Sequence, residues 1–288
     1  MLRRAGHRVD VVAGDSPAAS TDLARRAAGR GAALVLLGGD GLVHQVLPAV
    51  LGTGTPVGLV PGGTGNDTVT ALGLPADPGA AADAVVDALA AGATTAVDVG
   101  LARSDDGVQT PFTTVLCWGF DAAVSERTAR LRWPRGAHRY DLAIALETLA
   151  LQHRTVRVSV DDVALPATDA LLVAVGNGGW YGGGKRMVPH ARPDDGRLAV
   201  TLVGPATRRV LARLAPRLPA AGHLGHPLVT THDGVTVHLD ADAPIAAWAD
   251  GERVGRLPLT VTTRPDALTV LRPAWCVPAE PLGPFGSD

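Results

Sequence analysis

The stretch Ala33-Leu34-Val35-Leu36-Leu37-Gly38-Gly39-Asp40-Gly41 decides the fold class of this chain. Its apolar first half is typical of a buried strand, and a helical pattern follows its glycines. The same order recurs where an apolar run over 57–60 leads into the loop Pro61-Gly62-Gly63-Thr64-Gly65-Asn66-Asp67. This alternation predicts a parallel sheet covered by helices. Both loops should then open at the same edge of the sheet, where such folds bind ligands.

The sequence on either side extends this α/β pattern and then changes. After about residue 98, short strands follow one another with Gly, Pro and Asp between them, which is typical of an antiparallel sandwich or barrel. The expected strands lie over 9–12, 156–160, 170–175, 198–203, 235–239, 245–248, 259–261 and 268–271. The expected helices lie over 18–28, 42–51, 79–91, 140–152 and 207–218.

This change of pattern predicts two domains and a tail. We expect an α/β domain over 1–98, a β-rich domain over 99–272 and a tail over 273–288 that packs back on the first domain. The segment Leu2-Arg3-Arg4-Ala5-Gly6 has the pattern of a helix end leading into a strand. The expectation is therefore either a start placed too late or a domain that lacks its first strand and most of its first helix.

Composition limits the classes of function. Charged residues make up 19% of the chain and hydrophobic residues 46%, which predicts a packed core rather than disorder. The net charge of −2 argues against binding to nucleic acid. Cys117 and Cys276 fit no metal or disulfide framework, and no apolar run is long enough to span a membrane, so we expect a cytoplasmic protein. A zinc site at His223-x-x-His226 is not expected, because no third ligand is evident.

The two glycine-rich loops carry the first chemical signal. Glycines let the backbone approach a phosphate, and the free N–H groups at a helix start attract an anion. Asp40 would face a metal or a substrate hydroxyl, although a carboxylate that caps the helix is the simpler alternative. The second loop groups a hydroxyl, an amide and a carboxylate at Thr64, Asn66 and Asp67. Since Lys185 is the only lysine, phosphate would be held by backbone N–H groups, a metal or arginine.

Taken in order, the motifs of the chain resemble the diacylglycerol kinase catalytic-domain family, which includes bacterial lipid kinases and sphingosine and ceramide kinases. The resemblance runs from Gly6 onward. Its motifs are Gly38-Gly39-Asp40-Gly41-Leu42, the loop over 61–67, Leu72-Gly73-Leu74-Pro75, Val97-Asp98-Val99-Gly100, Trp118-Gly119-Phe120-Asp121, Gly182-Gly183-Gly184, Pro189-His190-Ala191, Asp194-Asp195-Gly196 and Asp250-Gly251-Glu252.

This resemblance implies a fold, an activity and a set of partners. The fold is an α/β nucleotide-binding domain like that of phosphofructokinase and NAD kinase, followed by an antiparallel β-sandwich. The activity is ATP-dependent transfer of phosphate to a lipid alcohol, which belongs to phospholipid biosynthesis. The enzyme would contact the inner face of the membrane transiently and peripherally. A homodimer through the β-domain stays open.

The resemblance also assigns site residues. Glu252 falls on the general base, with Asp250 beside it and Asp40 in the first loop. Magnesium for catalysis would be held by Asp67 and Asp98, and a structural magnesium by Asp195 and the main-chain oxygens of Arg192 and Arg197. The expected ATP contacts are Thr21, Gly38, Gly39, Asp40, Gly41, Leu42, Val43, His44, Gly63, Thr64, Asn66 and Asp67.

Several of these motifs have structural alternatives. Asp250-Gly251-Glu252 also fits a hairpin turn, and Asp194-Asp195-Gly196 also fits a simple turn. The helix over 140–152 either lines a lipid entrance or packs as core. Leu42 departs from the family's usual Thr, as it does in some eukaryotic members. Two other functions stay open: an NAD kinase, which shares the first glycine loop, and a truncated relic that binds nucleotide or lipid without catalysis.

Overall fold

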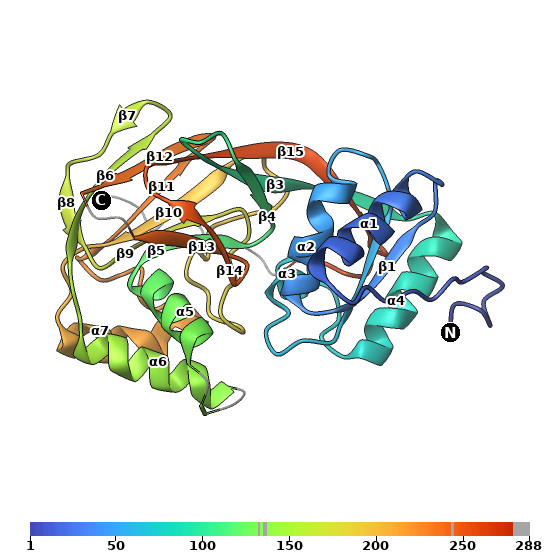
Figure 1. Cartoon of the computed structure of the whole chain (residues 1–288), viewed down its shortest axis with the longest axis horizontal. Coiled ribbons are helices and arrows are strands. Elements are labelled where there is room, and N and C mark those ends of the chain that lie inside the picture. Colours follow the sequence, from blue (N-terminus) through green and yellow to red (C-terminus); the bar gives the residue numbers. More distant parts are fainter. Residues whose placement is uncertain (132, 135–136, 243–244, 279–288) are drawn as a thin grey trace.

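The computed structural model describes residues 1–131, 133–134, 137–242 and 245–278. Figure 1 shows an α/β domain with helices α1 to α4 at one end and a β-sandwich with helices α5 to α7 at the other. The first domain contains α1 (Pro17–Ala28), β1 (Leu34–Gly38), α2 (Asp40–Val50), β2 (Val57–Pro61), α3 (Asp67–Ala71) and α4 (Pro78–Ala91). In the part of the chain that is described, no helix is long and apolar enough to cross a membrane.

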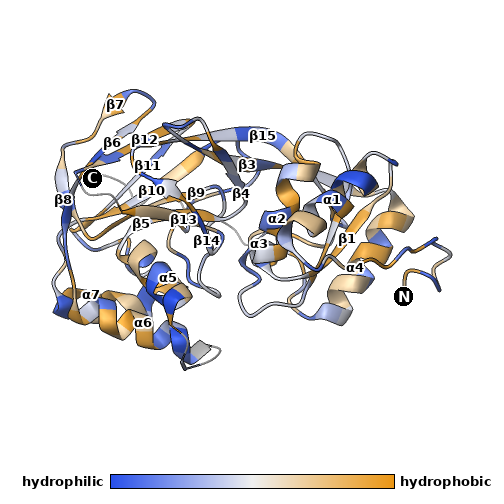
Figure 2. Cartoon of the chain, in the orientation of Figure 1, coloured by the Kyte–Doolittle hydropathy of each residue, from blue (hydrophilic) through white to orange (hydrophobic). Residues whose placement is uncertain are grey.

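The two strands that precede the glycine loops lie side by side. β1 and β2 pair in parallel, with Leu36 opposite Leu59 and Gly38 opposite Pro61. Both loops therefore leave the same edge of the sheet, as the sequence predicted. The helix over 79–91 is confirmed by α4, whose first turn is capped by Asp77, because its carboxylate accepts the Ala80 N–H at 2.8 Å. Figure 2 shows hydrophobic residues on β1 and α4, which pack in this domain's core.

A long two-stranded ribbon joins the first domain to the second. β15 (Leu259–Leu271) pairs antiparallel with β3 (Thr94–Ser104), and its Val270 also pairs in parallel with Val57 of β2. The ribbon continues past residue 98, where the domain boundary was expected, with a bulge of β15 opposite that residue. The segments over 259–261 and 268–271 are one strand rather than two, because Pro265 and Asp266 form a bulge instead of a turn.

The core of the second domain lies between two sheets, one of which continues into the first domain through β15 and β2. One sheet has the order β1-β2-β15-β12-β6-β7, with β3, β4 and β8 paired to its members, and the other has the order β11-β10-β9-β5-β13-β14. Trp118, Phe112 and Leu239 are buried between the sheets. The predicted architecture, an α/β domain followed by an antiparallel sandwich, is confirmed.

The sandwich domain contains the expected strands and several elements that were not predicted, among them β4, β5, β11, β14 and α5. Its strands are β4 (Gln109–Phe112), β5 (Val115–Gly119), β6 (Arg154–Val160), β7 (Val163–Ala164), β8 (Thr168–Ala170), β9 (Leu172–Gly176), β10 (Leu198–Val203), β11 (Val229–Gly234), β12 (Thr236–Ala241), β13 (Ala246–Ala249) and β14 (Glu252–Arg256). Its helices are α5 (Phe120–Arg130), α6 (Ala137–Leu149), α7 (Arg208–Leu214) and the 3₁₀ helix η1 (Ala215–Ala220).

Two expectations about local structure are wrong. Residues 9–12, which are described, form no strand, and Val11 and Val12 are 81% and 61% exposed, because no paired strand completes their hydrogen bonds. The helix expected over 207–218 ends at Leu214 and continues as η1, whose second residue is Pro216. The helix over 140–152 is α6, which begins and ends three residues earlier than expected.

The first residues of the predicted tail contact the first domain. Cys276 is buried in the core cluster that contains Val46 and Leu72. Gly73 has a φ of +67°, and a Cβ there would lie 2.3 Å from the Val277 carbonyl oxygen, so only glycine fits this contact. Residues 279–288 of the tail lie outside the described residues.

Candidate active site

The two glycine-rich loops touch each other. A Cβ added to Gly63 would lie 2.7 Å from the Gly39 Cα, so the backbones approach more closely than side chains would allow. Asn66 stabilises the second loop: its Oδ1 accepts the Gly63 N–H at 3.0 Å, and its Nδ2 donates to the Gly63 carbonyl at 2.9 Å. The edge formed by Gly62, Gly63, Thr64 and Gly65 is exposed and free of bulky side chains.

Asp40 connects the loops by capping a helix. Its carboxylate accepts the N–H groups of Asp67 at 3.0 Å and Thr68 at 2.9 Å, which are the first residues of α3. Asp40 therefore caps α3, which follows the second glycine loop, and not α2, of which it is the first residue. This contact places Asp40 Oδ2 3.0 Å and Asp67 Oδ2 3.6 Å from the position of a Cβ on Gly65. Two carboxylates thus meet at the exposed loop.

Asp67 also reaches across to the second domain. Its two carboxylate oxygens accept the N–H groups of Gly183 and Gly184, each at 2.9 Å. Burial raises the pKa of Asp67, and the neighbouring charge of Asp40 adds to the rise, whereas the two glycine N–H groups and Lys185 lower it. A carboxylate that is buried beside another carboxylate favours a cation nearby.

A cluster of polar and aromatic side chains beside the Gly182-Gly183-Gly184 loop was not predicted from the sequence. The Lys185 ammonium lies 5.0 Å from the centre of the Tyr140 ring and donates to the Gly182 carbonyl at 2.7 Å. Tyr181 donates its hydroxyl to Asp121 at 3.1 Å. Burial raises the pKa of Asp121 to about 6, although Tyr181 and Lys185 lower it. The signal available in the sequence was the single lysine next to three glycines, with Asp121 in another motif.

Glu252 faces the first loop from the other domain. It is the first residue of β14, it is exposed, and its Oε1 lies 3.8 Å from the position of a Cβ on Gly41. Gly41 is the second residue of α2, and among the described residues no side chain caps this helix. The free N–H groups of a helix start attract an anion. Glu252 therefore lies beside a place where a phosphate can bind.

Asp250, two residues earlier, has a different environment. Its buried carboxylate accepts the backbone N–H groups of Thr113 and Thr114 at 2.8 and 2.9 Å and both of their hydroxyls at 3.2 and 2.5 Å. His44 Nδ1 lies 3.8 Å away. Burial acts to raise the pKa of Asp250, but the nearby His44 and the hydrogen bonds from Thr114 and Thr113 outweigh it and lower the pKa. This carboxylate fixes the turn that presents Glu252, which favours a positioning role, and its expected catalytic role stays a prediction.

Three of the residues expected to contact ATP make contacts within the first domain instead of facing the exposed loops. Val43 is buried in the core, and its N–H points to the Gly39 carbonyl, so it packs the helix rather than lining the cleft. Leu42 packs partly buried against the same core. The Thr21 hydroxyl lies 2.8 Å from the Gln45 carbonyl and joins α1 to α2. The expected contacts of these three residues with ATP stay predictions.

Asp98 belongs to a different group from Asp67. Its carboxylate accepts the N–H groups of Gly196 at 2.6 Å and Asp266 at 3.0 Å. Burial raises the pKa of Asp195, and the charge of Asp98 is the next cause that raises it. The structure thus places Asp98 beside Asp195 of the expected structural site, and its expected part in holding the catalytic magnesium with Asp67 stays a prediction. The arginine side chains point elsewhere, with Arg192 on Asp194 and Arg197 on the Asp233 carbonyl, which leaves their main-chain oxygens as the predicted ligands.

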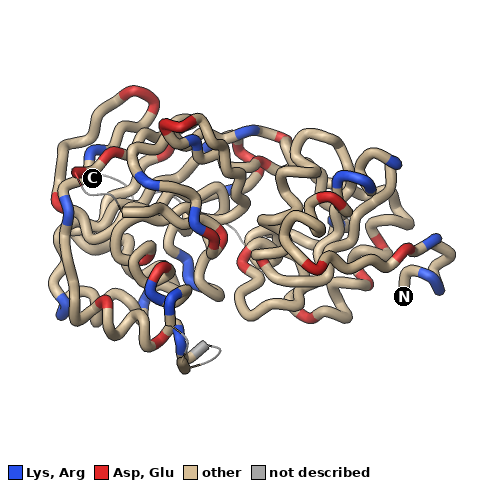
Figure 3. Tube along the Cα trace, in the orientation of Figure 1, with Lys and Arg blue, Asp and Glu red and all other residues tan. Residues whose placement is uncertain are grey.

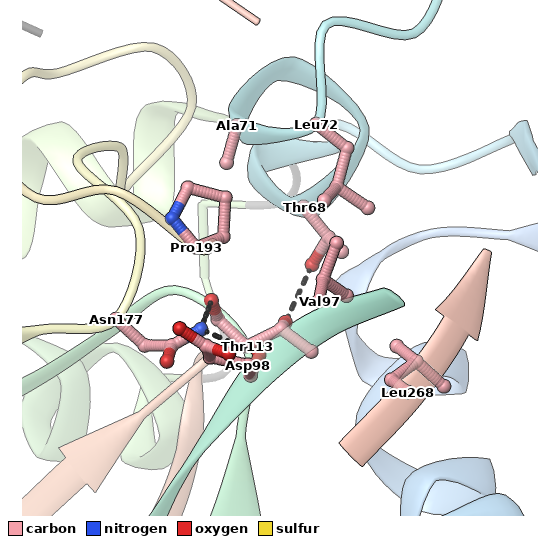
Figure 4. A pocket seen from close by; sticks show the side chains of 9 residues that line it. All are labelled: Thr68, Ala71, Leu72, Val97, Asp98, Thr113, Asn177, Pro193 and Leu268. Carbon is pink, nitrogen blue, oxygen red and sulfur yellow. Dashed lines mark hydrogen bonds between the residues drawn. The ribbon is translucent and has the colours of Figure 1, made fainter. Parts of the chain in front are cut away.

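The joint between the domains is tightly packed. Figure 4 shows Thr68 of α3 bonded to Thr113 of the sandwich at 2.9 Å, and Asn177 bonded to the main-chain oxygens of Asp98 and Thr113 at 2.9 and 3.1 Å. The cavity that these residues line measures about 10 Å³, which is room for a single water molecule. This joint is therefore too small to hold a nucleotide.

The carboxylates fit magnesium better than a transition metal. Within the described ranges, no group of three or more His, Cys, Asp or Glu side chains is placed to hold a metal ion. Magnesium does not require such a cage, because it keeps several waters and binds through one or two carboxylates and the substrate phosphates. Asp40 and Asp67 at the exposed Gly65 meet that requirement.

Comparisons with known proteins agree with this geometry. Residues 1–102 match the family described as the diacylglycerol kinase catalytic domain, and residues 114–272 match the YegS C-terminal NAD kinase β-sandwich-like domain. A diacylglycerol kinase of Mycobacterium tuberculosis is 37% identical over 277 residues, covering 94% of this chain and 88% of that protein. The chain belongs to the diacylglycerol kinase catalytic domain family. The expected class of enzyme, a phosphotransferase with an alcohol group as acceptor, is confirmed.

More distant members and structures extend the comparison. A diacylglycerol kinase of Staphylococcus haemolyticus is 26% identical, covering 89% of this chain and 76% of that protein. The crystal structure of a diacylglycerol kinase from Bacillus anthracis has a TM-score of 0.69 at 17% identity, covering 96% and 89% of the two chains. An NAD kinase from Archaeoglobus fulgidus in complex with ATP has a TM-score of 0.53 at 14% identity, covering 94% and 86%. These two structures share the fold of this family member.

Proposed function

We propose that this protein is an ATP-dependent lipid kinase that transfers the γ-phosphate to the hydroxyl of a diacylglycerol-like or sphingoid-like alcohol. The observation that carries the proposal is Glu252, which the second domain presents with its Oε1 3.8 Å from the position of a Cβ on Gly41, at the start of α2. The names of the similar proteins, diacylglycerol kinases, support a lipid acceptor.

In this proposal, different residues bind the phosphates, hold magnesium and accept the proton. The loops at Gly39 and Gly63 would hold the phosphates through backbone N–H groups, and magnesium held near Asp40 and Asp67 would neutralise phosphate charge. Glu252 would accept the proton of the acceptor hydroxyl as its oxygen bonds to the γ-phosphorus. The bond between that phosphorus and the β–γ bridging oxygen then breaks, and ADP leaves. Lys185 lies near enough to Asp67 to influence its charge and would add a positive charge at this cleft.

An apolar cavity in the second domain supports an acceptor with a hydrocarbon tail. The cavity lies between α7 with η1 and the strands β9, β10 and β11, and every lining residue except His223 is apolar. It measures about 30 Å³, so α7 would have to shift to admit a long chain. The lining residues are Leu171, Leu172, Met187, Val203, Ala206, Leu211, Leu214, Ala215, Leu218, His223 and Val229.

The test is transfer of labelled γ-phosphate from ATP to diacylglycerol, a sphingoid base, an isoprenoid alcohol and NAD⁺, assayed separately. The expected result is label in an organic-extractable lipid that requires magnesium. Label in NADP⁺ instead would overturn the lipid acceptor and support the NAD kinase alternative. ATP binding without transfer to any acceptor would contradict catalysis and favour the binding relic.

A further inference from the structure

The hairpin of α5 and α6 carries a tryptophan that the fold leaves exposed. Trp133 is 78% exposed, whereas Trp118 in the sandwich core is fully buried. A tryptophan side chain carries about 150–250 Å² of mostly apolar surface, and it is enriched where proteins meet the headgroup layer of a membrane. Figure 1 shows that this hairpin extends away from the sandwich at the edge of the molecule.

The sequence around this tryptophan is strongly basic. Residues 127–139 contain five arginines and one histidine but no Asp or Glu, although the whole chain has a net charge of −2. The Arg130 side chain is 77% exposed while it pairs with Glu126, and Arg127 pairs with Glu147. Figure 3 shows basic positions gathered towards the end of the hairpin. The basic charge is therefore local and accompanies the exposed aromatic ring.

The same hairpin leads directly to the candidate active site. Tyr140 belongs to α6, seven positions after Trp133, and its ring lies 5.0 Å from the Lys185 ammonium. Its hydroxyl lies 3.4 Å from the position of a Cβ on Gly182, in the loop that bonds Asp67. A surface that holds the end of the hairpin would therefore lie next to the cleft.

We propose that the hairpin tip, defined as Arg130, Leu131, Trp133 and Pro134, docks on an anionic lipid bilayer. Charge complementarity selects this partner, because anionic lipids attract clustered arginines and the headgroup layer accepts a tryptophan ring. The purpose of docking rests on the proposed function, in which the acceptor is a membrane lipid. The binding itself requires no turnover.

The test is sedimentation of the full chain with phosphatidylcholine vesicles that contain or lack phosphatidylglycerol. Wild type should bind the anionic vesicles more strongly, and added salt should weaken this binding. Trp133→Ala should weaken binding about tenfold, because the ring loses its place at the interface. Arg130→Gln should weaken it about fivefold. The matched control is Trp275→Ala, since Trp275 is 57% exposed in the tail, and it should bind like wild type.

Several results would overturn the proposal. One is equal binding of Trp133→Ala and wild type to anionic vesicles, and another is no binding by wild type. A third is a loss of vesicle binding in Trp275→Ala equal to that in Trp133→Ala. A fourth is binding of wild type to a labelled RNA that is tighter than its binding to anionic vesicles and that Arg130→Gln weakens. Phosphorylation of a short-chain diacylglycerol in solution separates the two proposals. If neither wild type nor any variant has this activity while Trp133→Ala and Arg130→Gln lose vesicle binding and Trp275→Ala does not, the kinase proposal fails and the docking surface is supported.

Discussion

Asp121 lies fully buried in the first turn of α5, where its pKa rises from 3.8 to about 6. The folded protein therefore holds a proton between these pH values that the unfolded chain has released, so this group's contribution to stability falls as pH rises through that window. A shift of this size corresponds to about 2 to 3 kcal/mol. Asp121→Asn should remove this pH dependence while keeping an oxygen that accepts the Tyr181 hydroxyl.

Urea unfolding at about pH 4.5 and about pH 7 measures this difference for wild type and Asp121→Asn. The variant should gain stability relative to wild type at the higher pH. Parallel changes in the two proteins would show that folding does not raise the pKa of Asp121.

Asp250 should contribute to stability more than its place in a hairpin turn indicates. Its carboxylate accepts four hydrogen bonds from Thr113 and Thr114, and Asp250→Ala would leave their backbone N–H groups without this acceptor. The expected loss in the free energy of unfolding is about 3 to 5 kcal/mol. Asp106→Ala is the matched control, because Asp106 accepts similar bonds from Ser104 and Val108 in an exposed turn. Equal stability of the two variants in urea would contradict the positioning role.

At the scale of the elements, the close approach of the two glycine loops is the feature to test. Gly63→Ala would place a Cβ 2.7 Å from the Gly39 Cα, a backbone atom that cannot rotate away. The loops should separate, and affinity for a non-hydrolysable ATP analogue should fall about tenfold or more. Gly225→Ala is the control, since no described atom outside its own neighbours lies within 4 Å of the added Cβ. Calorimetric titration in which both variants bind like wild type would show that the loops do not hold the nucleotide.

The sequence predicted elements well where local pattern decides them. The apolar runs at β1 and β2 and the helical pattern of α4 are local features, and they form as expected. The strand expected over 9–12 fails because a strand needs a partner, which a local apolar run does not supply. Pro265 and Asp266 predicted the end of a strand, but pairing with β3 on both sides continues β15 through a bulge.

In the candidate site, too, local motifs were predicted and long-range contacts were not. The loops and Glu252 were found from their motifs, and their closeness confirms that both loops open at one edge. The contacts of Asp67 with Gly183 and of Asp250 with Thr113 join residues more than 100 positions apart. No local pattern reports such contacts, so the positioning role of Asp250 and the cluster around Asp121 became visible only in the fold.

At the scale of the whole molecule, the β3–β15 ribbon should make the two domains unfold together. β15 pairs with β2 in the first domain and with β12 in the second, and Cys276 follows it into the first domain's core. Calorimetry should therefore show one transition whose calorimetric and van't Hoff enthalpies agree. Two separate transitions would contradict this coupling.

The central claim is that residues of both domains form one kinase site, and Glu252 tests it most directly. The measurement is the rate of phosphate transfer from ATP to a short-chain diacylglycerol by wild type, Glu252→Gln and the control Glu147→Gln. Glu147 lies on α6 and pairs with Arg127 of α5. The account predicts that Glu252→Gln lowers the rate about 10²- to 10⁴-fold while ATP still binds, and that the control keeps its activity. A Glu252→Gln enzyme that turns over like wild type would contradict it.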